Sequence, residues 1–174
     1  MTWPARVTLG EIGREPKTYA FEADVLARRE LVKQLDLLSL DSFSGEITVT
    51  PWLDGAVLAG RYSAELAQTC GITAEPLPQS LSNSFSLRVL PQGSPHAPAE
   101  SAGGGEIEID LEADDPPDLL ESDVIDLSGY AVEHLSLDLD PFPRKPGAEF
   151  VPPADDADLS PFAVLKAFKP RDDA

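Results

Sequence analysis

The sequence predicts an α+β fold: a mostly antiparallel sheet, or a partial barrel, packed by two main helices. Several segments alternate polar and apolar residues, which is the pattern of a strand with one buried face. Two other segments carry apolar residues at helical spacing. The length of 174 residues fits one domain, and an apolar content of 42% is sufficient for a hydrophobic core.

The strands are expected mainly in the first half of the chain, at residues 6–10, 17–23, 44–52, 56–68 and 80–90. The last of these has the clearest two-residue period, with Phe85 and Val89 on its apolar side. Asp54-Gly55 predicts a hairpin turn because both positions tolerate positive φ, and Gly60 indicates a bulge or bend. The last three strands therefore form an antiparallel meander, and residues 106–111 are expected to add a further strand.

Two amphipathic helices are expected, at residues 24–35 and 126–139. Each begins at an aspartate that can accept hydrogen bonds from unpaired backbone amides, Asp24 in the first and Asp126 in the second. The second helix ends at a run of alternating prolines, which cannot donate backbone hydrogen bonds. It carries His134 and Asp138 on its apolar side, four residues apart.

One domain is expected at residues 1–144, with a flexible linker at 91–105 that is rich in Gly, Pro, Ser and Ala. The remainder, 145–174, reads as an acidic, Pro-rich tail that is mobile as far as residue 160. Near its end, Ser160 and Pro161 are typical of a helix start. Apolar residues then recur three apart, so we expect a short terminal helix that docks on the body.

The net charge of −18 is unevenly distributed along the chain. Residues 1–99 contain 11 acidic and 8 basic residues, a net charge of −3, whereas residues 100–174 contain 20 and 5, a net charge of −15. Such a surface repels phosphate backbones and attracts basic proteins. The alternative is that the carboxylates only keep the chain soluble and monomeric.

The remaining composition indicates a cytoplasmic protein that does not enter a membrane. No apolar run approaches the roughly 20 residues that a spanning helix needs. The N-terminus lacks the basic and apolar stretches of a signal peptide. The single cysteine, Cys70, excludes an intramolecular disulfide and fits a reducing compartment.

No arrangement of residues predicts an enzyme, a cofactor or a metal site. Cys70 with His134 is a conceivable nucleophile and base, but a buried inert thiol is the alternative. His134 with Asp138 could serve acid–base chemistry or be a satisfied polar pair at the edge of the core. His96 lies in the linker without supporting ligands, and the acidic residues at 106–115 lack the spacing of a calcium loop. Phosphate-binding glycine motifs are also absent.

Three segments in order carry a family resemblance. Residues 68–76 (Gln-Thr-Cys-Gly-Ile-Thr-Ala-Glu-Pro) form a cysteine-containing turn that ends in Glu-Pro. Residues 125–144 start with Ile-Asp-Leu, continue as an acidic helix and end in Pro-Phe-Pro-Arg. Residues 161–166 (Pro-Phe-Ala-Val-Leu-Lys) form the terminal segment. Together they resemble the YceD family, the large ribosomal RNA subunit accumulation proteins of bacteria and plastids, in its alphaproteobacterial branch.

The resemblance implies a non-enzymatic role in the synthesis, processing or stability of large-subunit (23S) ribosomal RNA, and hence in ribosome assembly. Family members in other lineages carry additional cysteines, some arranged as metal pairs, so a chain with Cys70 alone is not expected to bind zinc. The residues that match the family's motifs are expected to be structural; they are Cys70, Glu75, Pro76, Asp126, Glu133, Pro141 and Phe162.

Two mechanisms remain open. In the first, the acidic half is an adaptor for a basic ribosomal protein or a pre-ribosomal particle, and the chain is a monomer. In the second, the protein contacts RNA directly through a local basic patch. Clustering of the cationic side chains on one face would favour the second mechanism, and scatter would favour the first. The candidate partner or RNA contacts are Arg6, Arg14, Arg28, Arg29, Arg61, Arg88, Phe142, Arg144 and Lys145.

Overall fold

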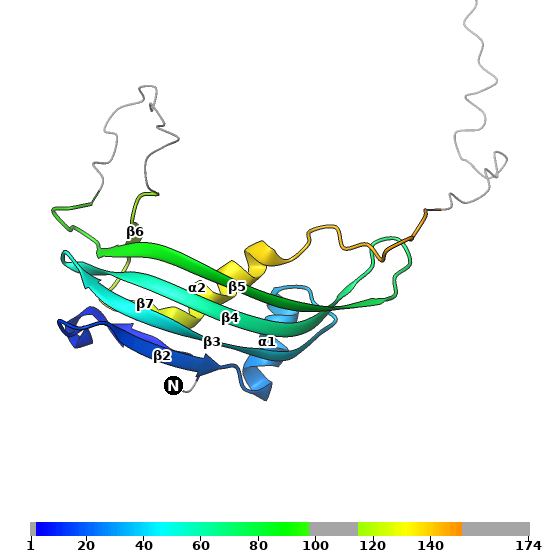
Figure 1. The fold of residues 1–174 in the computed structure, drawn as a ribbon, viewed down its shortest axis with the longest axis horizontal. Helices are drawn as coiled ribbons and strands as arrows, with labels where there is room; N and C mark the ends of the chain where they lie inside the picture. Colours follow the sequence, from blue (N-terminus) through cyan, green and yellow to red (C-terminus); the bar gives the residue numbers. More distant parts are fainter. Residues whose placement is uncertain (1–2, 98–114, 151–174) are drawn as a thin grey trace, which may run out of the picture.

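The structure, a computed structural model, describes residues 3–97 and 115–150 (Figure 1). It confirms the α+β class. In chain order the elements are β1 (Arg6–Thr8), the short 3-10 helix η1 (Leu9–Glu11), β2 (Lys17–Glu22), α1 (Val25–Gln34), β3 (Ser39–Trp52), β4 (Gly55–Thr69), β5 (Pro76–Pro91), β6 (Asp118–Leu120), β7 (Val124–Asp126) and α2 (Leu127–Asp138).

Five strands form one sheet in the order β2-β3-β4-β5-β6, and β1 pairs with β7 in a second sheet. All pairs are antiparallel except β5 with β6. The meander of β3, β4 and β5 is confirmed, with longer strands than predicted. Within the described residues the main sheet does not close into a barrel, because β2 and β6 remain as its two edges.

One face of the main sheet is buried. Side chains alternate across a sheet, so residues in register share a face: Tyr19, Ile47, Gly60 and Phe85 lie side by side on four strands. Tyr19, Ile47 and Phe85 are all buried. In the view of Figure 1, α1 and α2 cross behind the strands and cover this face. The core therefore lies between the sheet and the two helices.

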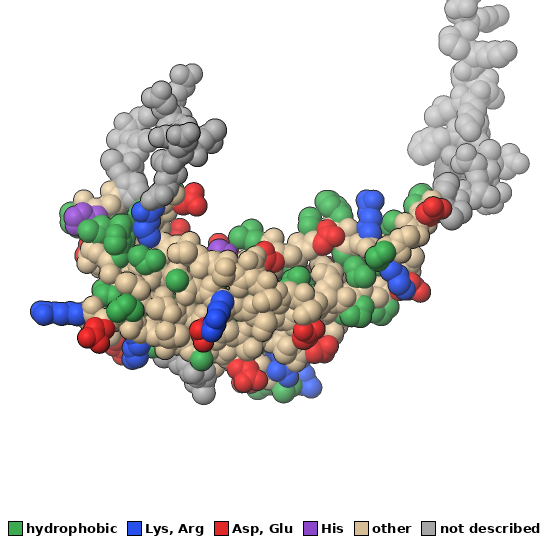
Figure 2. All heavy atoms as spheres, viewed as in Figure 1, with side chains coloured by type: hydrophobic (Ala, Val, Ile, Leu, Met, Phe, Trp, Pro, Cys, Tyr) green, Lys and Arg blue, Asp and Glu red, His purple; other side chains and the backbone are tan. Residues whose placement is uncertain are grey.

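The opposite face carries small polar side chains. Ser44, Ser63 and Ser82 are in register on three neighbouring strands. Figure 2 looks onto this face and shows few charged side chains over the centre of the sheet. One ion pair crosses it, between Arg61 Nη2 and Glu46 Oε1 at 2.7 Å. We refer to this surface as the open face.

Two glycines on the buried face admit aromatic rings from neighbouring strands. A Cβ added to Gly45 would lie 2.8 Å from Cζ of Phe21, and one added to Gly60 would lie 2.3 Å from Cζ of Phe85. The predicted bulge at Gly60 is wrong, because Gly60 is paired without interruption on both sides. The register instead shifts between Leu40 and Ser42. Gly60 is needed for close approach of a ring, which the sequence pattern did not distinguish from a bend.

The hairpin between β3 and β4 lies where it was predicted, but with a different backbone conformation. The positive φ falls on Leu53, at 53°, and not on Asp54 or Gly55. Gly55 is the first residue of β4, where an added Cβ would lie 2.0 Å from the carbonyl oxygen of Val89. Close packing against β5 therefore requires this glycine.

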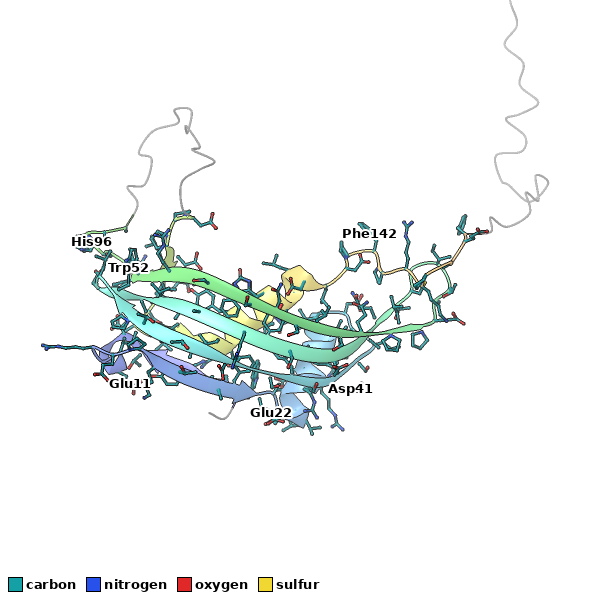
Figure 3. The ribbon with its side chains drawn as sticks, in the orientation of Figure 1. Glu11, Glu22, Asp41, Trp52, His96 and Phe142 are labelled. Atoms are coloured by element: carbon teal, nitrogen blue, oxygen red, sulfur yellow. The ribbon has the colours of Figure 1, made fainter. Side chains whose placement is uncertain are left out.

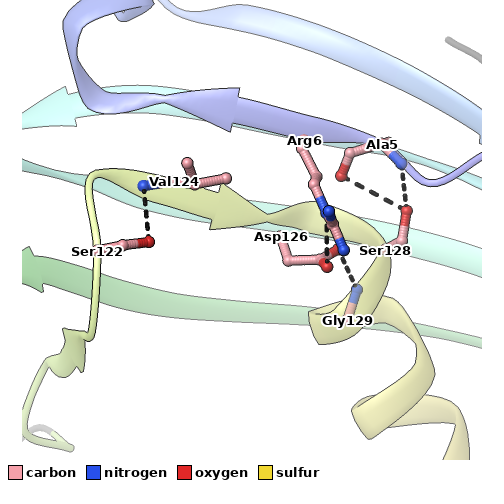
Figure 4. A network of polar contacts seen from close by, with 7 residues as sticks. All are labelled: Ala5, Arg6, Ser122, Val124, Asp126, Ser128 and Gly129. Atoms are coloured by element: carbon pink, nitrogen blue, oxygen red, sulfur yellow. Dashed lines mark hydrogen bonds and ion pairs between the residues drawn. The ribbon is translucent and has the colours of Figure 1, made fainter.

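Both predicted helix caps are present. Asp24 accepts a hydrogen bond from Ala27 N at 2.8 Å, and Asp126 accepts one from Gly129 N at 2.9 Å. Figure 4 shows that the start of α2 is also tied to the N-terminal strand. Arg6 pairs with Asp126 at 3.1 Å, and the amide of Ala5 donates to the Ser128 hydroxyl.

Part of the predicted linker packs on the body of the protein. Ser94 is buried, and its hydroxyl donates to Asp54 at 2.9 Å. The predicted strand at 106–111 and the terminal segment with Phe162 lie outside the described residues. No helix in the described part of the chain is long and apolar enough to cross a membrane.

Replacing Gly60 with alanine is expected to destabilise the fold. The new methyl group must displace the Phe85 ring, and overpacking of this kind costs about 1–3 kcal/mol. The measurement is the free energy of unfolding in urea. Gly13→Ala is the control, because an added Cβ at Gly13 has no atom within 4 Å. Equal stability of the two variants would contradict this role of Gly60.

Candidate interaction site

Two segments that are about 70 residues apart meet at one end of the sheet. The turn between β4 and β5 lies against the connection that follows α2. Gly71 N donates to the carbonyl oxygen of Pro143 at 2.9 Å, and Lys145 Nζ pairs with Glu75 Oε2 at 2.9 Å. We call this arrangement of residues 70–75 with 143–145 the Cys70 clamp. It brings together the first two segments of the family resemblance.

The turn itself is closed by local hydrogen bonds. Cys70 N donates to the carbonyl oxygen of Glu75, and Ala74 N donates to that of Cys70, both at 2.9 Å. Ala74 has a φ of 56°, in the left-handed region that a side chain rarely adopts. The Thr73 hydroxyl donates to Glu75 Oε2 at 3.3 Å and accepts from Glu75 N at 3.4 Å. The turn thus presents its cysteine and its carboxylate to the segment after α2.

The Cys70 sulfur lies at the centre of the clamp. Its side chain is buried, and Sγ accepts backbone N–H groups of Thr73 at 3.5 Å and Lys145 at 3.4 Å. Hydrogen bonding from the Thr73 side chain, and then from the backbone of Lys145, Thr73 and Ile72, lowers the pKa of the thiol to about 6. Burial acts in the opposite direction and is outweighed. The site can therefore hold a thiolate that is shielded from solvent.

The Glu75–Lys145 pair is half-exposed. The hydrogen bond and charge of Lys145 lower the pKa of Glu75, and those of Glu75 raise the pKa of Lys145. Pairs with this exposure contribute at most about 1 kcal/mol to stability. Beside the pair, Phe142 has an exposed fraction of 74%, and Arg144 is also exposed. Figure 3 places Phe142 on the connection after α2, at the opposite end of the sheet from Trp52 and His96.

The predicted His134–Asp138 pair is wrong. Asp138 accepts hydrogen bonds from the Tyr62 hydroxyl and from Asn83 Nδ2. His134 stacks on Phe85 with ring centroids 4.1 Å apart. No hydrogen bond in the described part of the chain joins His134 to Asp138 or to Cys70. The partners Tyr62 and Asn83 come from β4 and β5, so helical spacing could not reveal them. The signal available in the sequence was Tyr62 in a predicted strand, because the hydroxyl of a buried tyrosine usually has a hydrogen-bond partner.

The predicted cationic contacts do not form one patch. Arg61 lies on the open face and Arg144 in the Cys70 clamp, whereas Arg28 and Arg29 belong to α1 on the covered side of the sheet. Several of them already have partners. Beyond the ion pairs given above, Arg28 donates to the carbonyl of Ala23 at 3.0 Å, and Arg88 lies 5.5 Å from the ring centroid of Trp52.

Acidic residues gather over β6, β7 and α2 instead. The segment 115–133 contains six acidic residues and no Lys or Arg; they form what we call the acidic surface and are Asp115, Asp118, Glu121, Asp123, Asp126 and Glu133. Arg6 and Arg88 border it, through Asp126 and through the carbonyl oxygen of Asp115. Burial, and then the charges of Asp118 and Glu133, raise the pKa of Tyr130 to about 12. Two of the six carboxylates, Asp118 and Glu133, thus act on the same side chain.

The described residues include no group of three or more His, Cys, Asp or Glu that could hold a metal ion. Asp126 and Pro141 lie where the sequence placed them, at the start of α2 and after it. Pro76, which was expected in the turn before the strand at 80–90, is instead the first residue of β5. Comparisons of the chain with protein-family models, with curated proteins and with solved structures find no match.

Replacing Tyr62 with phenylalanine is expected to lower the free energy of unfolding by about 1–3 kcal/mol. The change removes a hydrogen bond from a buried hydroxyl to a carboxylate, which also accepts from Asn83 and anchors the end of α2. Chemical denaturation measures the loss. Tyr19→Phe is the control, since no described residue hydrogen-bonds to the Tyr19 hydroxyl. A similar loss in both variants would contradict the assignment.

The Cys70 thiol is expected to titrate near pH 6 in the folded protein, as measured by its ultraviolet thiolate absorbance. Because the folded pKa lies below the unfolded value of about 8.5, the thiolate stabilises the fold above pH 8.5 and this contribution is lost as the pH falls through 6. As the pH falls from about 8.5 through 6, the difference in the free energy of unfolding between wild type and Cys70→Ser should therefore decrease. Thr73→Val should raise the thiol pKa, whereas the neighbouring Thr69→Val should not.

Proposed function

We propose that this protein is a non-enzymatic factor in the accumulation of large-subunit ribosomal RNA and in ribosome assembly, acting as an acidic adaptor for a basic ribosomal protein. The observation that carries the proposal is the separation of charge. Six acidic residues gather on the acidic surface, while the cations lie apart on different elements. A segment with six acidic residues and no Lys or Arg attracts a basic protein, which speeds encounter and favours binding.

Direct RNA binding is the alternative that the charge distribution disfavours. RNA affinity depends on several cations that neutralise phosphates together. Here the side chains of Arg6, Arg61 and Lys145 are each paired with a carboxylate. These three cations also lie on different parts of the fold, so they do not offer phosphates a common basic surface. An exposed base next to an exposed aromatic, Arg144 with Phe142, is the combination that best fits an RNA contact.

A non-enzymatic role is supported by the positions of the two candidate catalytic groups. Cys70 is enclosed by the turn and by Lys145, and His134 stacks on Phe85. A catalytic thiolate must also be reachable by its substrate, whereas the Cys70 side chain is buried. The thiolate of Cys70 is stabilised by N–H groups instead, which suits a structural role in the clamp.

The proposal is tested by binding of the purified full chain to isolated basic proteins of the large subunit and to a 23S ribosomal RNA transcript. We expect one or more proteins to bind at about 0.15 M salt and the transcript not to bind. Neutralising three residues of the acidic surface (Glu121→Gln, Asp123→Asn, Glu133→Gln) should weaken protein binding about tenfold, since exposed charges contribute a few tenths to 1 kcal/mol each.

The control variant removes the same three charge types elsewhere on the surface (Glu15→Gln, Glu22→Gln, Asp41→Asn) and should bind as the wild type does. Equal weakening by both variants would show that net charge alone, and not this surface, is recognised. Tight binding of the transcript without binding of any ribosomal protein would overturn the adaptor role. In that case Arg144→Gln should weaken RNA binding more than Arg61→Gln.

A further inference from the structure

A groove with an apolar floor and polar edges runs between the two helices on the covered side of the molecule. Its floor includes Leu31 of α1 and Val132 of α2, and its volume is about 570 Å³. A second hollow of about 560 Å³ continues it beyond the helix ends, because Leu35 and Ser136 line both. The combined groove therefore extends from Trp3 to Pro143.

Two large apolar side chains at this groove are left exposed. Leu137 has an exposed fraction of 73%, and Leu38 has one of 51%. Both belong to the groove lining, Leu137 at the end of α2 and Leu38 just before β3. A segment seated in the groove would bury them together.

The edges of the groove are negatively charged. Its lining includes Glu30 and Glu133 between the helices, and Asp36 and Asp140 in the continuation; Asp126 also lines it but is paired with Arg6. Of the described residues that line it, none is a lysine or arginine. The groove is thus suited to a segment that combines apolar residues with positive charge.

The chain itself contains such a segment. The sequence continues beyond Phe150 from Val151 to Ala174. Within this stretch, residues 160–171 contain no Asp or Glu. Within them Phe162, Leu165 and Phe168 recur three apart, and the bases are Lys166, Lys169 and Arg171. The other stretch outside the described residues, 98–114, has six acidic residues and no base, so the groove would repel it.

The chain is long enough for this contact. Pro143, at the near end of the groove, precedes Phe150 by seven residues, which span at most about 25 Å. The twelve residues from Phe150 to Phe162 span up to about 40 Å, so the segment can return to the groove. Pro143 is itself held in place by Gly71.

We propose that residues 160–171 of the same chain dock in the groove between α1 and α2, with their apolar residues on Leu35 and Leu137 and their bases beside the groove's carboxylates. The docked segment covers the exposed apolar side chains and links the two helices. This inference does not depend on the proposed function, since it concerns the isolated chain.

The test is nuclear magnetic resonance of the full chain. Phe168→Asp should shift the signals of Leu31, Leu35, Val132 and Leu137 and leave those of the open face, such as Ser63, unchanged. Ile109→Asp, in the acidic stretch, is the matched control and should not shift the groove. Shifts on the open face, or none in the groove, would overturn the proposal.

A reciprocal substitution in the groove completes the test. Leu137→Asp should speed amide exchange of residues 162–168 about tenfold, because it releases the docked segment. Leu53→Asp, at a residue with a similar exposed fraction of 57% in the β3–β4 turn, is the control and should have no effect. Groove signals that change on dilution would show that the segment binds a second copy, which would overturn docking within one chain.

Discussion

A chain of aromatic contacts links the sheet to the helices that cover it. Phe21 lies over Gly45, and its ring is 5.4 Å from that of Phe43, which is fully buried. Phe43 in turn contacts Tyr62 at 5.9 Å, and the Tyr62 hydroxyl donates to Asp138 of α2. A Cβ at Gly45 would lie 2.3 Å from the carbonyl oxygen of Arg61 and 2.8 Å from the Phe21 ring, so this glycine allows both β4 and the first ring to approach. The series of contacts thus connects this close approach on the sheet to the end of α2.

The two faces of the main sheet carry different side chains, and most charged residues lie outside its long strands. The buried face has apolar side chains for the helices, while the open face has serines and a single crossing pair, Arg61 with Glu46. Most of the other charged side chains among the described residues belong to the short strands, the helices and the connections. The acidic surface and the groove between α1 and α2 share Asp126 and Glu133, so the two proposed contacts, with a basic partner and with residues 160–171, would use neighbouring carboxylates.

The Cys70 clamp gives a physical reason for a cysteine, a glutamate and a lysine at positions far apart in the sequence. The turn offers a thiol and a carboxylate, and the proline-rich connection offers an N–H and an ammonium group. Each interaction alone is weak, since Glu75 and Lys145 are half-exposed. Together with the bond from Gly71 to Pro143, they fix the direction in which the connection leaves α2 and present Phe142 to solvent.

The spacing of apolar residues and the presence of N-cap aspartates determine local structure. The α+β class, the meander and the helix starts at Asp24 and Asp126 were therefore predictable from the sequence. The net charge and its uneven distribution were likewise visible there. Tertiary structure alone decided which residues meet: Asp138 with Tyr62 in place of His134, Gly60 beneath Phe85, and Lys145 on Glu75. These contacts join residues on different elements, and helical or strand spacing relates only residues within one element.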